Sequence, residues 1–191
     1  MKNEIIINIH AVIPASRVNG PGSRMVVYFQ GCSRRCALCF NPETHPFEQR
    51  CLFTVEEIFA TNSVDGIEGI TVSGGEPFAQ PGALAALLKE ARLTHGLTTV
   101  VYTGFTLEEV RSSRELRSSL PFIDVLIDGP YDETRPEETL LARGSTNQGF
   151  HFLTDRYRLE DFYLPGKAEI LIGPGGVVRG TGFSTLPFPM K

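Results

Sequence analysis

The chain has 191 residues, of which 41% are hydrophobic and 21% are charged, a composition typical of a soluble globular protein. Its formal net charge of -4 argues against nucleic acid as the main partner, because phosphate binding requires a basic surface. No apolar run approaches the ~18 residues that span a membrane, and no signal-peptide cleavage pattern is present. We therefore expect a cytoplasmic protein without membrane contact.

The middle of the chain alternates between strand-like and helix-like segments. Two helices are predicted to begin with capping boxes, which pair Thr54 with Glu57 and Thr106 with Glu109. A further helix is indicated by apolar residues at helical spacing and is expected to stop at Gly96. In chain order we expect a strand over 25–30, a helix over 54–61, a strand over 69–73, a helix over 83–95, a strand over 98–102, a helix from 106 to 118 or 119, and a strand over 123–128.

This alternation predicts an α/β fold in which right-handed strand–helix–strand units build a parallel sheet. Beyond residue 150 the pattern changes, and segments 168–172 and 177–179 flank a glycine-rich turn, which indicates an antiparallel hairpin. We expect this hairpin to cover one edge of the sheet. The short connections predict a single domain over 1–191, with a core over about 5–150 and an accessory segment over about 151–191.

Candidate ligand-binding residues follow four of the predicted strands. They are the cysteine loop after Gly31, the turn 74–77 (GGEP), the pair 103–104 (TG) and the pair 128–129 (DG). Because ligands of parallel α/β sheets gather at the carboxyl ends of the strands, these segments are expected to converge on one site.

Three of the four cysteines, Cys32, Cys36 and Cys39, lie within eight residues of one another. In a chain expected in the cytoplasm, such clustering favours metal binding over disulfides. A cubane cluster needs four iron ligands, so three thiolates would leave one iron open, as in catalytic metal sites. The alternative is a zinc site that also uses Cys51, although a free cysteine is more often a small apolar side chain.

Together with its neighbouring motifs, the cysteine loop resembles the radical S-adenosylmethionine (SAM) superfamily, and within it the activating enzymes of glycyl radical proteins. The likeness is greatest to the activating component of anaerobic ribonucleotide reductase and covers about residues 5–150. Residues 37–38 (AL) depart from the Pro-Gly that is frequent in activating enzymes. The similar segments are 19–22 (NGPG), 26–44 (with the cysteines), 73–77 (SGGEP), 102–105 (YTGF), 127–130 (IDGP) and 143–148 (RGSTNQ).

The resemblance implies a partial (β/α) barrel that holds a [4Fe–4S] cluster on Cys32, Cys36 and Cys39. The fourth iron would chelate the amino and carboxylate groups of the SAM methionine. The residues that the resemblance assigns to SAM binding are Leu38, Ser73, Gly74, Gly75, Glu76, Thr103, Asp128, Ser145 and Asn147.

The implied reaction begins when a flavodoxin- or ferredoxin-type protein reduces the cluster. SAM is then cleaved to methionine and a 5′-deoxyadenosyl radical, which removes hydrogen from a glycine of a partner glycyl radical enzyme. One alternative is a radical SAM enzyme for a peptide or a small metabolite, with a substrate surface built by residues 151–191. Another is a non-enzymatic iron–sulfur or zinc protein, which predicts a fourth ligand at Cys51 and no affinity for SAM.

Overall fold

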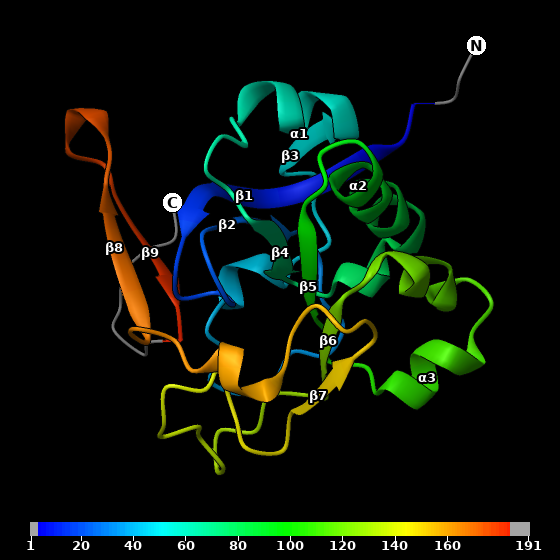
Figure 1. Ribbon diagram of the computed structural model, residues 1–191, viewed down its shortest axis with the longest axis vertical. Helices are drawn as coiled ribbons and strands as arrows, with labels where there is room; N and C mark the ends of the chain where they lie inside the picture. Colours follow the sequence, from blue (N-terminus) through cyan, green and yellow to red (C-terminus); the bar gives the residue numbers. More distant parts are fainter. Residues whose placement is uncertain (1–3, 184–191) are drawn as a thin grey trace.

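The computed structural model describes residues 4–183, so the last eight residues of the predicted accessory segment lie outside the described part. A seven-stranded sheet forms its centre, in the spatial order β3-β1-β2-β4-β5-β6-β7 (Figure 1). The strands are β1 (Ile6–Ser16), β2 (Arg24–Phe29), β3 (Cys51–Thr54), β4 (Gly69–Gly74), β5 (Thr98–Tyr102), β6 (Val125–Asp128) and β7 (Gly149–Phe152).

The four middle strands, β2, β4, β5 and β6, run parallel to one another, which confirms the predicted α/β class. Helix α1 (Val55–Thr61) precedes β4, helix α2 (Pro81–Leu93) connects β4 to β5, and helix α3 (Leu107–Ser112) follows β5. None of the helices in the described part of the chain is long and apolar enough to cross a membrane.

Both predicted capping boxes are present. The side chains of Thr54 and Thr106 accept hydrogen bonds from the backbone N–H groups of Glu57 and Glu109, respectively. The side chain of each glutamate accepts a hydrogen bond from the backbone N–H of its threonine. The second helix is shorter than expected, because α3 ends at Ser112 and a separate 3-10 helix spans Leu116–Phe122. The hydroxyl of Ser113 accepts the N–H of Leu116 and so starts a new turn in place of the helical pattern.

The sheet is antiparallel at both sides of its parallel centre, which the sequence analysis did not predict. Strand β1 pairs with β2 and β3, and β7 pairs with β6, all in antiparallel register. The apolar run at the start of β1 is interrupted by Asn8, whose side chain hydrogen-bonds the backbone of Glu48 and Arg50. Because the polar Asn8 breaks the apolar pattern, this segment was not predicted as a strand.

Side chains of the parallel strands alternate between two covered faces. Met25, Val27 and Phe29 pack with residues of α1 and α2 in the main hydrophobic core. Val26 and Tyr28 point to the opposite face. There, Phe162 and Leu164 of the C-terminal segment pack with residues of β5 and β6.

The C-terminal strands β8 (Ala168–Ile172) and β9 (Val178–Gly182) form the predicted antiparallel hairpin. The expectation that it covers an edge of the sheet is wrong, because β3 and β7 are the edges and the hairpin is a separate two-stranded sheet beside β1 (Figure 1). Leu171 packs there against the cluster formed by Ile13 of β1 and Val26 and Tyr28 of β2. The hydroxyl of Thr181 also lies 2.6 Å from that of Tyr28, so the hairpin is attached to the face of β2 that is opposite the main hydrophobic core.

Candidate functional site

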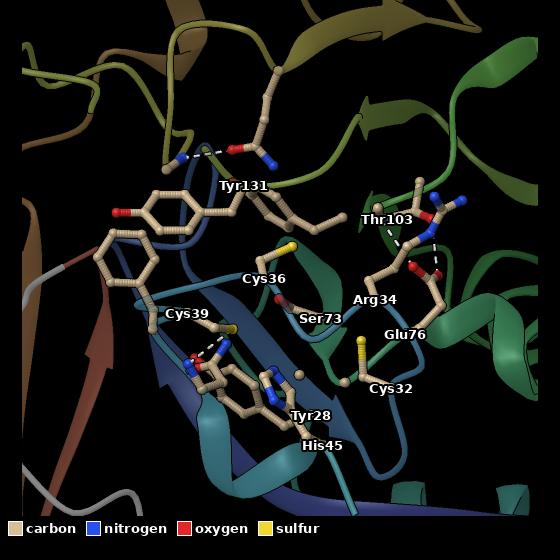
Figure 2. Close-up of a pocket in the computed structure, with 18 of the residues that line it drawn as sticks. Tyr28, Cys32, Arg34, Cys36, Cys39, His45, Ser73, Glu76, Thr103 and Tyr131 are labelled. Carbon is tan, nitrogen blue, oxygen red and sulfur yellow. Dashed lines mark hydrogen bonds between the residues drawn. The ribbon is translucent and has the colours of Figure 1, made fainter. Parts of the chain in front are cut away.

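One pocket lies at the carboxyl ends of the four parallel strands, where the sequence analysis placed the site (Figure 2). Segments that follow β2, β4, β5 and β6 contribute to it, together with the end of β9. Its lining residues are Asn19, Tyr28, Cys32, Arg34, Cys36, Cys39, Phe40, Asn41, His45, Ser73, Gly74, Gly75, Glu76, Tyr102, Thr103, Gly104, Gly129, Tyr131, Gly144, Gln148, Gly182 and Phe183.

The loop that carries the three cysteines is fixed at its base by backbone hydrogen bonds. Gly31 donates its N–H to Thr44 at 2.8 Å, and Cys32 donates to His45 at 3.0 Å. Within the loop, Arg35 and Leu38 have φ angles of 46° and 48°, in the left-handed region that non-glycine residues seldom adopt. The loop therefore holds a constrained shape, as is frequent at functional sites.

Cys32, Cys36 and Cys39 all line the pocket. Burial raises the pKa of the free Cys32 thiol and raises that of Cys39 to about 11, so metal binding at these residues must release protons. Among residues 4–183, no three His, Cys, Asp or Glu side chains converge closely enough to hold a single metal ion. In an iron–sulfur cluster each thiolate binds a different iron, and three separate thiols around one cavity fit that donor set.

Cys51 lies elsewhere. It begins β3, faces Ile9 of β1 in the sheet register, and packs against the main hydrophobic core. It is not among the residues that line the pocket. This placement agrees with a small apolar side chain and gives no support to a four-cysteine zinc site.

The turn after β4 packs directly on the base of the cysteine loop. Gly75 donates its N–H to Phe29 at 2.8 Å, and Glu76 donates to the carbonyl oxygen of Gly31 at 2.9 Å. Gly74 has a φ of 101°, and a Cβ on Gly75 would overlap the carbonyl oxygen of Gly31. Glycine is therefore required at both positions, and the two motifs share one backbone junction.

Glu76 is 2% exposed, and its carboxylate is held by three hydrogen bonds. Oε1 accepts from the N–H of Phe78 at 3.0 Å. Oε1 also accepts from the hydroxyl of Thr103 at 2.8 Å, and Oε2 accepts from the N–H of Gly104 at 2.8 Å (Figure 2). Burial raises the pKa of Glu76, and these hydrogen bonds oppose that shift. The result is a fixed acceptor on the pocket wall, with lone pairs remaining for a ligand.

Aromatic rings enclose another side of the pocket. The ring centroid of Phe40, next to Cys39, lies 4.9 Å from that of Tyr131 and 6.1 Å from that of Phe183. The same three rings also line a second cavity of about 260 Å³, together with Leu164 and other residues. This aromatic wall could not be predicted from the sequence, because single aromatic residues far apart in the chain form no motif.

The structure brings most of the sequence-predicted site residues together. Those that line the pocket are Cys32, Cys36, Cys39, Ser73, Gly74, Gly75, Glu76 and Thr103.

Four predicted contacts of the cofactor do not line the pocket. Leu38 is 77% exposed. Asp128 accepts the first N–H of α3 at 2.6 Å, and Ser145 and Asn147 hydrogen-bond the backbone of loop 130–132. Asp128, Ser145 and Asn147 thus bond to the protein backbone, and Leu38 is exposed to solvent. Contact of these four residues with a cofactor stays a prediction.

Gln148 is a lining residue within a predicted motif that was not singled out from the sequence. Its side-chain oxygen accepts from Gly144 at 2.9 Å, and its amide donates to Gly129 at 3.1 Å. Gln148 therefore holds the loop that follows β6 in place at the pocket.

Comparison with known proteins identifies similar chains. The model of the 4Fe–4S single cluster domain matches residues 18–151. The anaerobic ribonucleoside-triphosphate reductase-activating protein of Vibrio cholerae is 33% identical over 160 residues, which cover 78% of this chain and 99% of that protein. The protein of the same name from Pasteurella multocida is 32% identical over 145 residues, covering 71% and 90%. Among solved structures, QueE from Escherichia coli matches with a TM-score of 0.40 and 17% identity, over 55% of this chain and 54% of that one.

Proposed function

The chain belongs to the 4Fe–4S single cluster domain family, and we propose that it is a radical SAM activating enzyme. The observation that carries the proposal is the meeting of three cysteine thiols and the glycine-rich turn 73–76 in one cavity. When bound and reduced, the cluster supplies the electron that cleaves SAM into methionine and a 5′-deoxyadenosyl radical. The protein's own residues bind, orient and shield the reacting groups.

In this proposal Cys32, Cys36 and Cys39 hold the [4Fe–4S] cluster. The support is their common cavity and the position of Cys51 on the hydrophobic core, away from that cavity. Three thiolates leave the fourth iron of the cluster without a cysteine ligand, so it can bind a substrate or cofactor, as in catalytic metal sites.

The turn after β4 is the proposed site for the amino group of SAM. The backbone at Gly74 and Gly75 can approach a ligand closely because no side chain intervenes. The Glu76 carboxylate offers a charge-assisted hydrogen bond to an ammonium group. Thr103 and Gly104 already hold this carboxylate in place, so little reorganisation accompanies binding.

We propose that the hydrogen donor is a glycine of a partner protein, namely an anaerobic ribonucleoside-triphosphate reductase. The proposal follows the names of the relatives, of which this chain covers almost the full length. The cavity of about 260 Å³ beyond Phe40, Tyr131 and Phe183 offers space beside the pocket for a segment of such a protein. A flavodoxin- or ferredoxin-type protein would supply the electron.

A second candidate function is radical SAM chemistry on a peptide or a small metabolite. One observation favours it: Phe183 reaches the pocket from the C-terminal segment, outside the matched residues 18–151. Part of the pocket wall is thus built by a segment that the family model does not include.

The direct test is activation of the reductase from the organism that encodes this chain. The reconstituted protein, SAM, dithionite and the reductase are mixed without oxygen, and the glycyl radical is detected by electron paramagnetic resonance (EPR). We expect a radical on the reductase with the wild-type chain and none with Cys39→Ser. SAM cleavage without a radical on the reductase would contradict the proposed substrate, and a failure to cleave SAM would contradict the whole proposal.

A further inference from the structure

Arg34 lies in the cysteine loop, between Cys32 and Cys36, yet its side chain reaches residues that follow β5. Its guanidinium carbon is 4.2 Å from the centroid of the Phe105 ring. One guanidinium nitrogen is 3.3 Å from a carboxylate oxygen of Glu109. Arg34 therefore links the cysteine loop to α3 across one side of the pocket.

Contacts along its whole length hold this side chain in place. A Cβ on Gly104 would lie 3.0 Å from the Cγ of Arg34, so the aliphatic stem packs on the backbone at Gly104. The planar guanidinium suits both an aromatic face and a carboxylate, which a lysine ammonium would not match. The neighbouring Arg35, in contrast, is exposed.

The position of Arg34 gives its charge an electrostatic effect on the pocket. Among the described residues that line the pocket, Arg34 supplies the fixed positive charge and the buried Glu76 a negative one. Glu109 does not line the pocket, and its side chain is 48% exposed against 29% for Arg34, so water screens the Glu109 charge more strongly. Arg34 therefore makes the potential inside the pocket more positive.

Reduction adds one electron to a cluster that already carries the charge of its thiolates. The reduction potential of an iron–sulfur cluster depends on net charge, hydrogen bonds and solvent exposure. A cation fixed in the ligand loop stabilises the reduced form more than the oxidised form, because the reduced form is more negative.

We propose that Arg34 raises the reduction potential of the cluster, and that Phe105 and Glu109 hold its charge in position. The inference rests on the proposed function only in requiring a cluster on the three cysteines. Arg34 thus acts through its fixed positive charge, and a higher reduction potential allows a weaker electron donor to reduce the cluster.

The test is a redox titration of the reconstituted protein without SAM, followed by the EPR signal of the reduced cluster. We expect Arg34→Gln to lower the ratio of reduced to oxidised cluster about tenfold at a given potential, a shift of about 59 mV for a one-electron couple. Arg34→Lys should shift the potential less, because it keeps the charge. The matched control is Arg35→Gln, which removes the same charge from an exposed position of the same loop, where water screens it, and should shift the potential much less than Arg34→Gln does.

Glu109→Gln provides a second variant outside the cysteine loop. A glutamine can keep the capping role and can still accept a neutral hydrogen bond from Arg34, so the guanidinium stays in place beside Phe105. Only the negative charge that offsets Arg34 is removed, so the potential should rise, opposite in sign to Arg34→Gln. Equal potentials for Arg34→Gln, Arg35→Gln and the wild type would overturn the inference while leaving the proposed function intact. If Arg34→Gln fails to bind a cluster, an unchanged potential in Glu109→Gln overturns it. A wild-type protein that assembles no cluster would overturn the proposed function as well.

Discussion

The backbone of Gly75 lies against the carbonyl group of Gly31, so closely that a Cβ on Gly75 would overlap the Gly31 oxygen. Gly31 precedes the first cysteine of the loop, and Gly75 precedes the buried Glu76. The proposed cluster ligands and the proposed SAM contacts are therefore fixed relative to each other through backbone atoms alone.

Replacing Gly75 with alanine should break this junction. We expect Gly75→Ala to lower the free energy of unfolding of the cluster-free protein by about 1–3 kcal/mol, the usual cost of overpacking. Its iron content after reconstitution should also fall. Urea unfolding and iron analysis measure both effects.

Gly82→Ala is the matched control, since a Cβ on Gly82, in the first turn of α2, meets no atom within 4 Å. This variant should be as stable as the wild type or up to about 1 kcal/mol more stable. Wild-type stability and full iron loading of Gly75→Ala would show that the junction can relax.

Thr103→Val removes the hydroxyl that donates to Oε1 of Glu76 at 2.8 Å. Loss of one buried hydrogen bond to a charged group, about 1.5–3 kcal/mol, should loosen the carboxylate and weaken SAM binding roughly tenfold or more. Equilibrium dialysis with labelled SAM measures the Kd. Thr103→Ser keeps the hydroxyl and should restore binding, whereas wild-type affinity in Thr103→Val would contradict the proposed role of Glu76.

At Leu38 the role implied by the family resemblance differs from the position of the side chain in the structure. The resemblance assigns it to SAM binding, but the side chain is 77% exposed and does not line the pocket. We expect Leu38→Ala to change the Kd for SAM less than about twofold, because exposed substitutions remove few contacts. A tenfold weaker Kd would mean that the loop rearranges so that Leu38 reaches the ligand.

The attachment of the C-terminal hairpin depends on Thr181. Its hydroxyl accepts from Nδ2 of Asn19 at 2.7 Å and lies 2.6 Å from the hydroxyl of Tyr28, and all three residues are buried. Thr181→Val removes both of these buried hydrogen bonds, so the free energy of unfolding should fall by about 1–3 kcal/mol. Urea unfolding compares it with Thr181→Ser, which keeps the hydroxyl; equal stability of all three proteins would contradict this role.

The candidate site could be located from the sequence because its main motifs are local. The three cysteines lie in one loop, and Glu76 follows a strand whose apolar character is plain. The parallel sheet then places both at one edge. The capping boxes at Thr54 and Thr106 are equally local, and both were predicted correctly.

Features that depend on distant contacts could not be predicted. Arg34 resembles any other loop arginine in sequence, and only the fold brings Phe105 and Glu109 to it. Phe183 meets Phe40 from the far end of the chain. Asn8 interrupted the apolar pattern of β1 because its side chain bonds to a segment 40 residues away.

The most direct test of the proposed function is EPR of the anaerobically reconstituted, dithionite-reduced protein, recorded with and without SAM. We expect a [4Fe–4S]⁺ signal that changes when SAM is added, with 5′-deoxyadenosine formed in the same sample. Cys51→Ala should keep both properties, because Cys51 packs on the core and not in the pocket. A signal that SAM does not alter, or stoichiometric zinc without iron, would contradict the proposed function.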